Sequence, residues 1–65
     1  MPDTDSTAAD LSSIETMLAE LAGRLERATE AVAAQEREDL AGELLEVQRL
    51  IEAANRRLGR LSRQL

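Results

Sequence analysis

The sequence predicts an all-α protein: an antiparallel two-helix hairpin of the coiled-coil type that pairs with a second hairpin into a four-helix bundle. Apolar residues recur at spacings of three and four along most of the 65 residues, and this pattern changes phase once near residue 36. Aromatic residues and cysteine are absent, so the core can contain only aliphatic side chains and methionine. A chain of this length forms one domain at most.

Residues 1–9 are predicted to form a disordered acidic tail because they are small and polar and include Pro2. The hairpin is then expected to occupy residues 10–65. Asp10 is suited to cap the first helix, and Ser12 and Glu15 have the spacing of a capping box.

The first helix is predicted over about 10–34. Its apolar row follows the heptad spacing and consists of Leu11, Ile14, Leu18, Leu21, Leu25, Ala28 and Val32. Gly23 lies outside this row, where glycine costs about 1 kcal/mol relative to alanine without opening the core.

A turn is predicted at about 35–38, although residues 33–39 contain neither glycine nor proline. Their composition favours helix, so one continuous helix of about 55 residues is the competing model. The heptad phase disfavours it, because the first row continued past Val32 reaches Asp39, whereas the second row starts at Leu40. On one helix the two rows would lie roughly 150° apart, and a turn removes this conflict.

The second helix is predicted over about 39–65. Its apolar row consists of Leu40, Leu44, Val47, Ile51, Ala54, Leu58, Leu61 and Leu65. Antiparallel pairing of the two apolar rows forms one line of contact between the helices, which we call the seam, with Leu11 opposite Leu61 at one end. Gly42 and Gly59 are expected to face outward. Candidate pairs beside the seam are Asp10 with Arg57, Met17 with Leu50, and Arg24 with Glu43.

The composition argues against an enzyme. Histidine, cysteine, lysine and tyrosine are all absent, so most general bases, nucleophiles and transition-metal ligands are missing. We therefore expect no catalytic residues, no metal, no cofactor and no small-molecule substrate. No stretch approaches the roughly 18 apolar residues that a membrane span needs, and the acidic start lacks the apolar core of a secretory signal. A cytoplasmic protein is the expectation.

A few apolar residues lie outside the seam, and a two-helix chain is too small to be stable alone. The predicted partner or oligomer interface consists of Met17, Ala31, Leu45 and Leu50. This set suggests a small adaptor, oligomerisation module or accessory-regulatory subunit that packs helices against itself, as a homodimer, or against a larger protein. The simpler interpretation is that these are ordinary scattered surface residues.

Arginines are spaced by 7, 4 and 3 residues on the outward side of the second helix. This candidate stripe for an anionic partner consists of Arg49, Arg56, Arg60 and Arg63. It gives the alternative hypothesis of a nucleic-acid-associated factor. That alternative is weaker, because the chain carries a net charge of −5 and has no aromatic side chains to stack on bases. A membrane-surface helix is weaker still, and a solvated helix end is the simplest interpretation.

Overall fold

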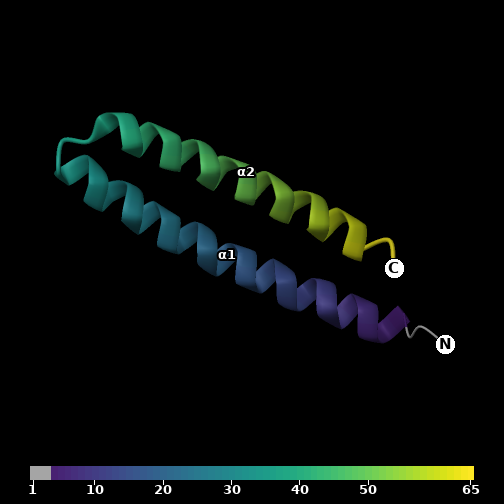
Figure 1. Ribbon diagram of the computed structural model, residues 1–65. Helices are drawn as coiled ribbons and strands as arrows, with labels where there is room; N and C mark the ends of the chain where they lie inside the picture. Colours follow the sequence, from purple (N-terminus) through teal and green to yellow (C-terminus); the bar gives the residue numbers. More distant parts are fainter. Residues whose placement is uncertain (1–3) are drawn as a thin grey trace.

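The structure, a computed structural model, describes the backbone of residues 4–65 and the side chains from residue 6 onward. Two helices, α1 (Thr4–Ala34) and α2 (Glu38–Ser62), lie side by side and antiparallel, so that the start of α1 and the end of α2 are at the same end of the molecule (Figure 1). The Cα atoms extend over 53 × 15 × 14 Å, the shape of a rod. The predicted antiparallel hairpin is confirmed, and the continuous helix is wrong.

The helix ends differ from the expected positions mainly at the N-terminus. α1 begins at Thr4, so residues 4–9 of the predicted tail are helical, whereas residues 1–3 lie outside the described part. Ala8 and Ala9 have the highest helix propensity of any residue type, which favours this extension. α1 ends at Ala34 as predicted, and α2 ends at Ser62 in a short turn instead of continuing to residue 65.

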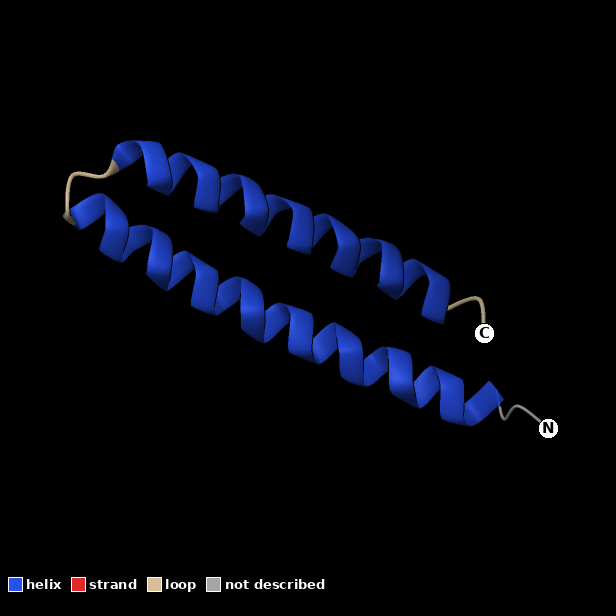
Figure 2. Cartoon of the chain, in the orientation of Figure 1, coloured by secondary structure: helices blue, strands red, loops and turns tan. Residues whose placement is uncertain are grey.

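The turn between the helices is a Schellman motif formed without glycine (Figure 2). The backbone N–H of Arg37 donates to the carbonyl of Val32 at 3.2 Å, and the N–H of Glu36 donates to the carbonyl of Ala33 at 3.0 Å. Glu36 takes the left-handed position of this motif, with φ of 61°. The motif ends α1 and reverses the chain within residues 35–37, inside the range that the heptad phase indicated.

Heptad rows of side chains face each other across the hairpin. On α1 the inward-facing, at least half-buried residues are Leu11, Glu15, Leu18, Ala22, Leu25, Thr29 and Val32. On α2 they are Ala41, Leu44, Gln48, Ile51, Asn55, Leu58 and Ser62, with the buried Gly59 beside the last of them. Each helix therefore contributes one aliphatic row and one small or polar row, which we call the polar row.

The predicted seam is therefore half right. Its aliphatic half, which includes Leu18, Leu25 and Ile51, lies between the helices. The other half is wrong, because its members are exposed: Ile14, Leu21, Ala28, Leu40, Val47, Ala54 and Leu61. Leu65 belongs to the aliphatic row and is also exposed, because α2 ends at Ser62. Each helix is rotated about 50° from the expected orientation, the angle between neighbouring heptad rows.

Small residues explain this rotation. Ala22 and Gly59 are the most buried of the described residues, and the Glu15 side chain of α1 lies over Gly59. The distance between packed helices depends on the side chains at their contact, so small residues allow the closest approach. Gly59 was expected to face outward and instead lies in the interface, which corrects that prediction. Gly42 does face open space.

The interface itself holds little large apolar volume. Within the described part of the chain, no large side chain is fully buried. The Asn55 Oδ1 atom is shielded from solvent and has no hydrogen-bond partner. The Thr29 hydroxyl donates to the Leu25 carbonyl of its own helix at 2.8 Å, so it does not join the helices. The hairpin alone therefore leaves much of its apolar surface in contact with solvent.

Candidate functional site: an apolar face

An apolar surface covers one side of the hairpin, and we call it the apolar face. It consists of Ile14, Leu21, Ala28, Leu40, Val47, Ala54 and Leu61, all of them exposed. Each of these residues comes one residue before a member of the polar row, so all of them occupy the same heptad position on their helix. Antiparallel helices are related by a local twofold axis normal to the hairpin, so equivalent heptad positions on α1 and α2 lie on the same side.

The apolar face is as large as the largest apolar patches found on typical monomeric proteins. Its five large side chains are between 38% and 54% exposed. Each helix contributes one heptad row to the face, and neither row contains a charged residue between residues 14 and 28 or between residues 40 and 61. The face extends over residues 40–61 of α2, which is about 32 Å at 1.5 Å per residue, and the 15 Å width of the rod then gives an area of about 480 Å². A continuous apolar surface of this size commonly marks an interaction site.

Three of the four residues predicted for a partner interface border this face. Met17 and Ala31 lie on the outer margin of α1, and Leu50 lies on the outer margin of α2, where it is 65% exposed. Leu45 belongs to a row on the opposite side of α2, so the four residues do not form one patch.

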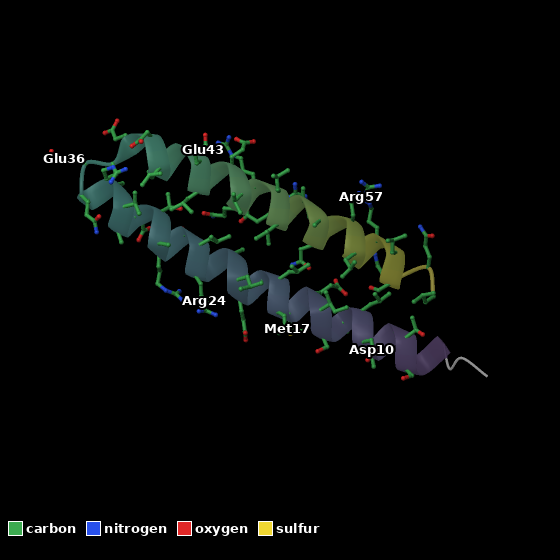
Figure 3. The ribbon with its side chains drawn as sticks, in the orientation of Figure 1. Asp10, Met17, Arg24, Glu36, Glu43 and Arg57 are labelled. Carbon is green, nitrogen blue, oxygen red and sulfur yellow. The ribbon has the colours of Figure 1, made fainter. Side chains whose placement is uncertain are left out.

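Among the side chains that the structure describes, the charged residues along the outer margins form no ion pair across the hairpin. In Figure 3, Arg24 extends away from α2 and Arg57 extends away from α1. The candidate pairs that these arginines were expected to form, with Glu43 and Asp10, are therefore wrong. The reason is the same rotation, which moves these positions from the flanks of the seam to the outer margins.

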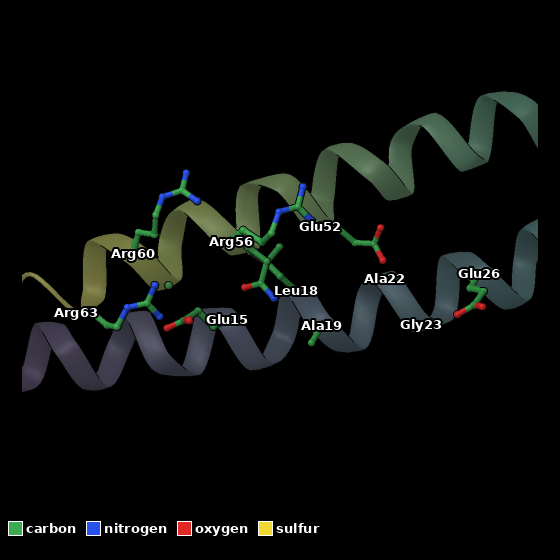
Figure 4. A pocket seen from close by; sticks show the side chains of 12 residues that line it. Glu15, Leu18, Ala19, Ala22, Gly23, Glu26, Glu52, Arg56, Arg60 and Arg63 are labelled. Carbon is green, nitrogen blue, oxygen red and sulfur yellow. The ribbon is translucent and has the colours of Figure 1, made fainter.

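The opposite side of the hairpin holds a shallow groove with a volume of about 790 Å³ (Figure 4). Its lining includes three arginines of the predicted stripe: Arg56, Arg60 and Arg63. Arg49 is not part of it, and its exposed guanidinium lies 3.8 Å from Glu46. The structure thus brings together three of the four stripe residues.

Three carboxylates share this groove with the arginines: Glu15, Glu26 and Glu52. Glu15 accepts a hydrogen bond of 3.2 Å from the Ser62 hydroxyl and lies over Gly59, where a Cβ atom would be 3.0 Å from its Oε1. Between residues 6 and 65, no groove arginine lies within 4.0 Å of a groove carboxylate. The groove therefore presents charges of both signs instead of the uniformly basic surface that nucleic acid requires.

No family model, curated protein or solved structure matches this chain. Within residues 4–65, no helix has the length and apolar character to cross a bilayer, and no group of three metal-ligating side chains occurs. The apolar face is the candidate site because of its exposed, continuous aliphatic side chains.

Sequence reasoning assigned the residues of this face to the inside of the hairpin. A signal for the correct assignment was present, because the apolar stripe of each helix is wider than a two-row coiled-coil seam. Met17 and Leu50 extend it by a third row. A stripe of that width is typical of helices that pack against more than one neighbour.

Proposed function

We propose that this chain is a non-enzymatic helical oligomerisation module, acting as a small adaptor or accessory subunit through helix packing. Its apolar face packs against the same face of a second copy and forms a four-helix bundle. The observation that carries this proposal is the uninterrupted apolar face beside an interface that contains little apolar volume of its own.

A second copy is the partner that fits this face best. The apolar face runs for about 32 Å along the hairpin, and a partner must offer a complementary apolar surface of about the same length. A second hairpin does so automatically, since a twofold interface uses the same patch on both subunits. The pairing would bury Leu21 and Val47 near the middle of the interface and bring the margin residues Met17 and Leu50 toward the second copy.

The test compares matched substitutions on the two sides of α2. Val47 and Leu45 are similarly exposed, at 43% and 39%, and lie two residues apart on opposite sides. We expect the wild-type chain to sediment as a dimer at micromolar concentration. Val47→Gln, alone or with Leu21→Gln, should shift it to monomer by weakening dimerisation at least about tenfold, because polar groups would then be buried at the contact.

Leu45→Gln is the control and should leave the dimer intact. A well-folded wild-type monomer at micromolar concentration would contradict the proposal. So would equal weakening by the Leu45 and Val47 substitutions. If the chain binds a larger helical protein but never a second copy of itself, the adaptor part of the proposal stands and the homodimer part is wrong.

The nucleic-acid alternative gains little support from the groove, because each of its three arginines shares the surface with carboxylates. It would replace our proposal if the chain bound duplex DNA or RNA at low salt and lost that binding when Arg56, Arg60 and Arg63 were changed to Glu.

A further inference from the structure

We infer that the hairpin is a two-state element in which α1 and α2 rotate about their own axes, and that pairing with a second copy selects the observed state. In the other state the residues of the apolar face turn inward and the polar row turns outward. The inference rests on the proposed self-association, and it adds a conformational change coupled to that association.

Both states share the same aliphatic row. Leu18, Leu25 and Ile51 lie between the helices in the observed structure, and they also belong to the seam that the heptad pattern predicts. The apolar face and the polar row flank this shared row on its two sides. A rotation of about 50° therefore turns the apolar face inward and the polar row outward, while the shared row stays in contact. The two antiparallel helices turn in opposite directions, as meshing gears do.

Polar contacts hold the observed state weakly. The shielded Asn55 Oδ1 atom lacks a partner, and such an atom costs free energy compared with one that reaches water. The Thr29 hydroxyl is satisfied within α1. The hydrogen bond from Ser62 to Glu15 is only partly buried, so water can replace it. Rotation would release all of these groups to solvent at little cost.

Apolar burial favours a different state in the monomer and in the dimer. In a lone hairpin, rotation covers Leu21 and Val47, which are otherwise 43% exposed. In a dimer, those side chains are already covered by the second copy, so rotation would remove them from the contact. Because pairing stabilises only the observed state, it shifts the equilibrium toward that state. Residues 35–37 are the described backbone segment between the helices that must absorb the rotation.

Disulfide trapping distinguishes the two states, because the chain has no native cysteine. Thr29→Cys with Leu44→Cys reports the observed state, in which both positions face inward. Ala28→Cys with Leu44→Cys reports the rotated state, in which residue 28 would face inward. This pair differs from the first pair only in the position of the cysteine on α1. A bond forms only where the Cα atoms approach to about 4.4–6.8 Å. A second matched set, Leu18→Cys with either Asn55→Cys or Ala54→Cys, repeats the test with different substitutions.

The yield of intramolecular disulfide is measured under mild oxidation over a dilution series, with sedimentation and helicity recorded on the same samples. On dilution from dimer to monomer, we expect the yield ratio of the 28–44 bond to the 29–44 bond to rise by about tenfold or more. The ratio of the 18–54 bond to the 18–55 bond should rise with it.

The two proposals fail differently. If the dimer dissociates on dilution while both yield ratios stay constant, the rotation is overturned and the oligomerisation function stands. If the wild-type chain is a folded monomer at every concentration, the function is overturned and the coupling of rotation to association fails with it.

Discussion

Two glycines of α2 show how a single position depends on its surroundings. Gly42 has no atom within 4 Å of where a Cβ would be, whereas at Gly59 a Cβ would lie 3.0 Å from the Glu15 carboxylate. Both lie inside α2, and within a helix glycine is less favourable than alanine by about 1 kcal/mol. The same substitution should therefore act differently at the two positions.

We expect Gly42→Ala to raise the free energy of unfolding by about 1 kcal/mol, the full gain in helix propensity. Gly59→Ala should give a smaller gain or none, because the Glu15 side chain must move and its hydrogen bond with Ser62 must change. Urea unfolding at one fixed protein concentration measures both values. An equal gain at the two positions would contradict the packing of the Glu15 side chain over Gly59.

The turn shows how an element can end without the residue that usually ends it. Glu36 lies in the left-handed region at φ 61°, which costs an L-residue roughly 1–2 kcal/mol. The Schellman hydrogen bonds from Glu36 and Arg37 to the last turn of α1 offset that cost. A glycine at this position would keep both hydrogen bonds without the steric penalty.

Glu36→Gly should consequently stabilise the hairpin by about 1 kcal/mol, with an unchanged helix content. Gln35→Gly is the matched control: Gln35 is outside the left-handed region, so the added backbone freedom should reduce stability. Chemical unfolding followed by circular dichroism measures both variants. If Glu36→Gly destabilises the chain, the left-handed turn is not the conformation in solution.

The whole molecule is a thin rod whose apolar surface is divided between its inside and one outer face. If a second copy covers that face, folding and association are linked, and the stability depends on protein concentration. A tenfold increase in concentration should raise the melting temperature by on the order of 5 °C, given the size of the chain. Thermal unfolding over a hundredfold concentration range tests this. A constant midpoint would mean that the copies unfold independently.

The hairpin was predicted correctly because the heptad phase shows which side of a helix is apolar, and this side changes where the chain turns. The shift between Val32 and Leu40 indicated a turn even though the turn residues themselves favour helix. The left-handed Glu36 was not predictable from residue type, since glycine or asparagine normally takes that position. Its conformation follows from where the two packed helices must be joined.

The choice of which rows face inward was also beyond the sequence pattern. Leu18 and Leu25 belong to either seam, so the heptad spacing alone does not distinguish the two orientations. The decision depends on how side chains pack around Ala22 and Gly59, which is a property of the packed pair of helices. For the same reason, the sequence found the margin residues Met17 and Leu50 of the candidate site and misplaced its centre.

Both ends of the described chain lie at the end of the rod opposite the turn (Figure 1). This arrangement determines how the hairpin responds to mechanical force. Tension applied between the two ends peels the helices apart from the open end, where the Ser62–Glu15 hydrogen bond is loaded first. The contacts then break one after another instead of sharing the load, as they would if the helices were pulled past each other. A lone hairpin of this geometry opens under low force, and the turn at Glu36 is the last part to feel it.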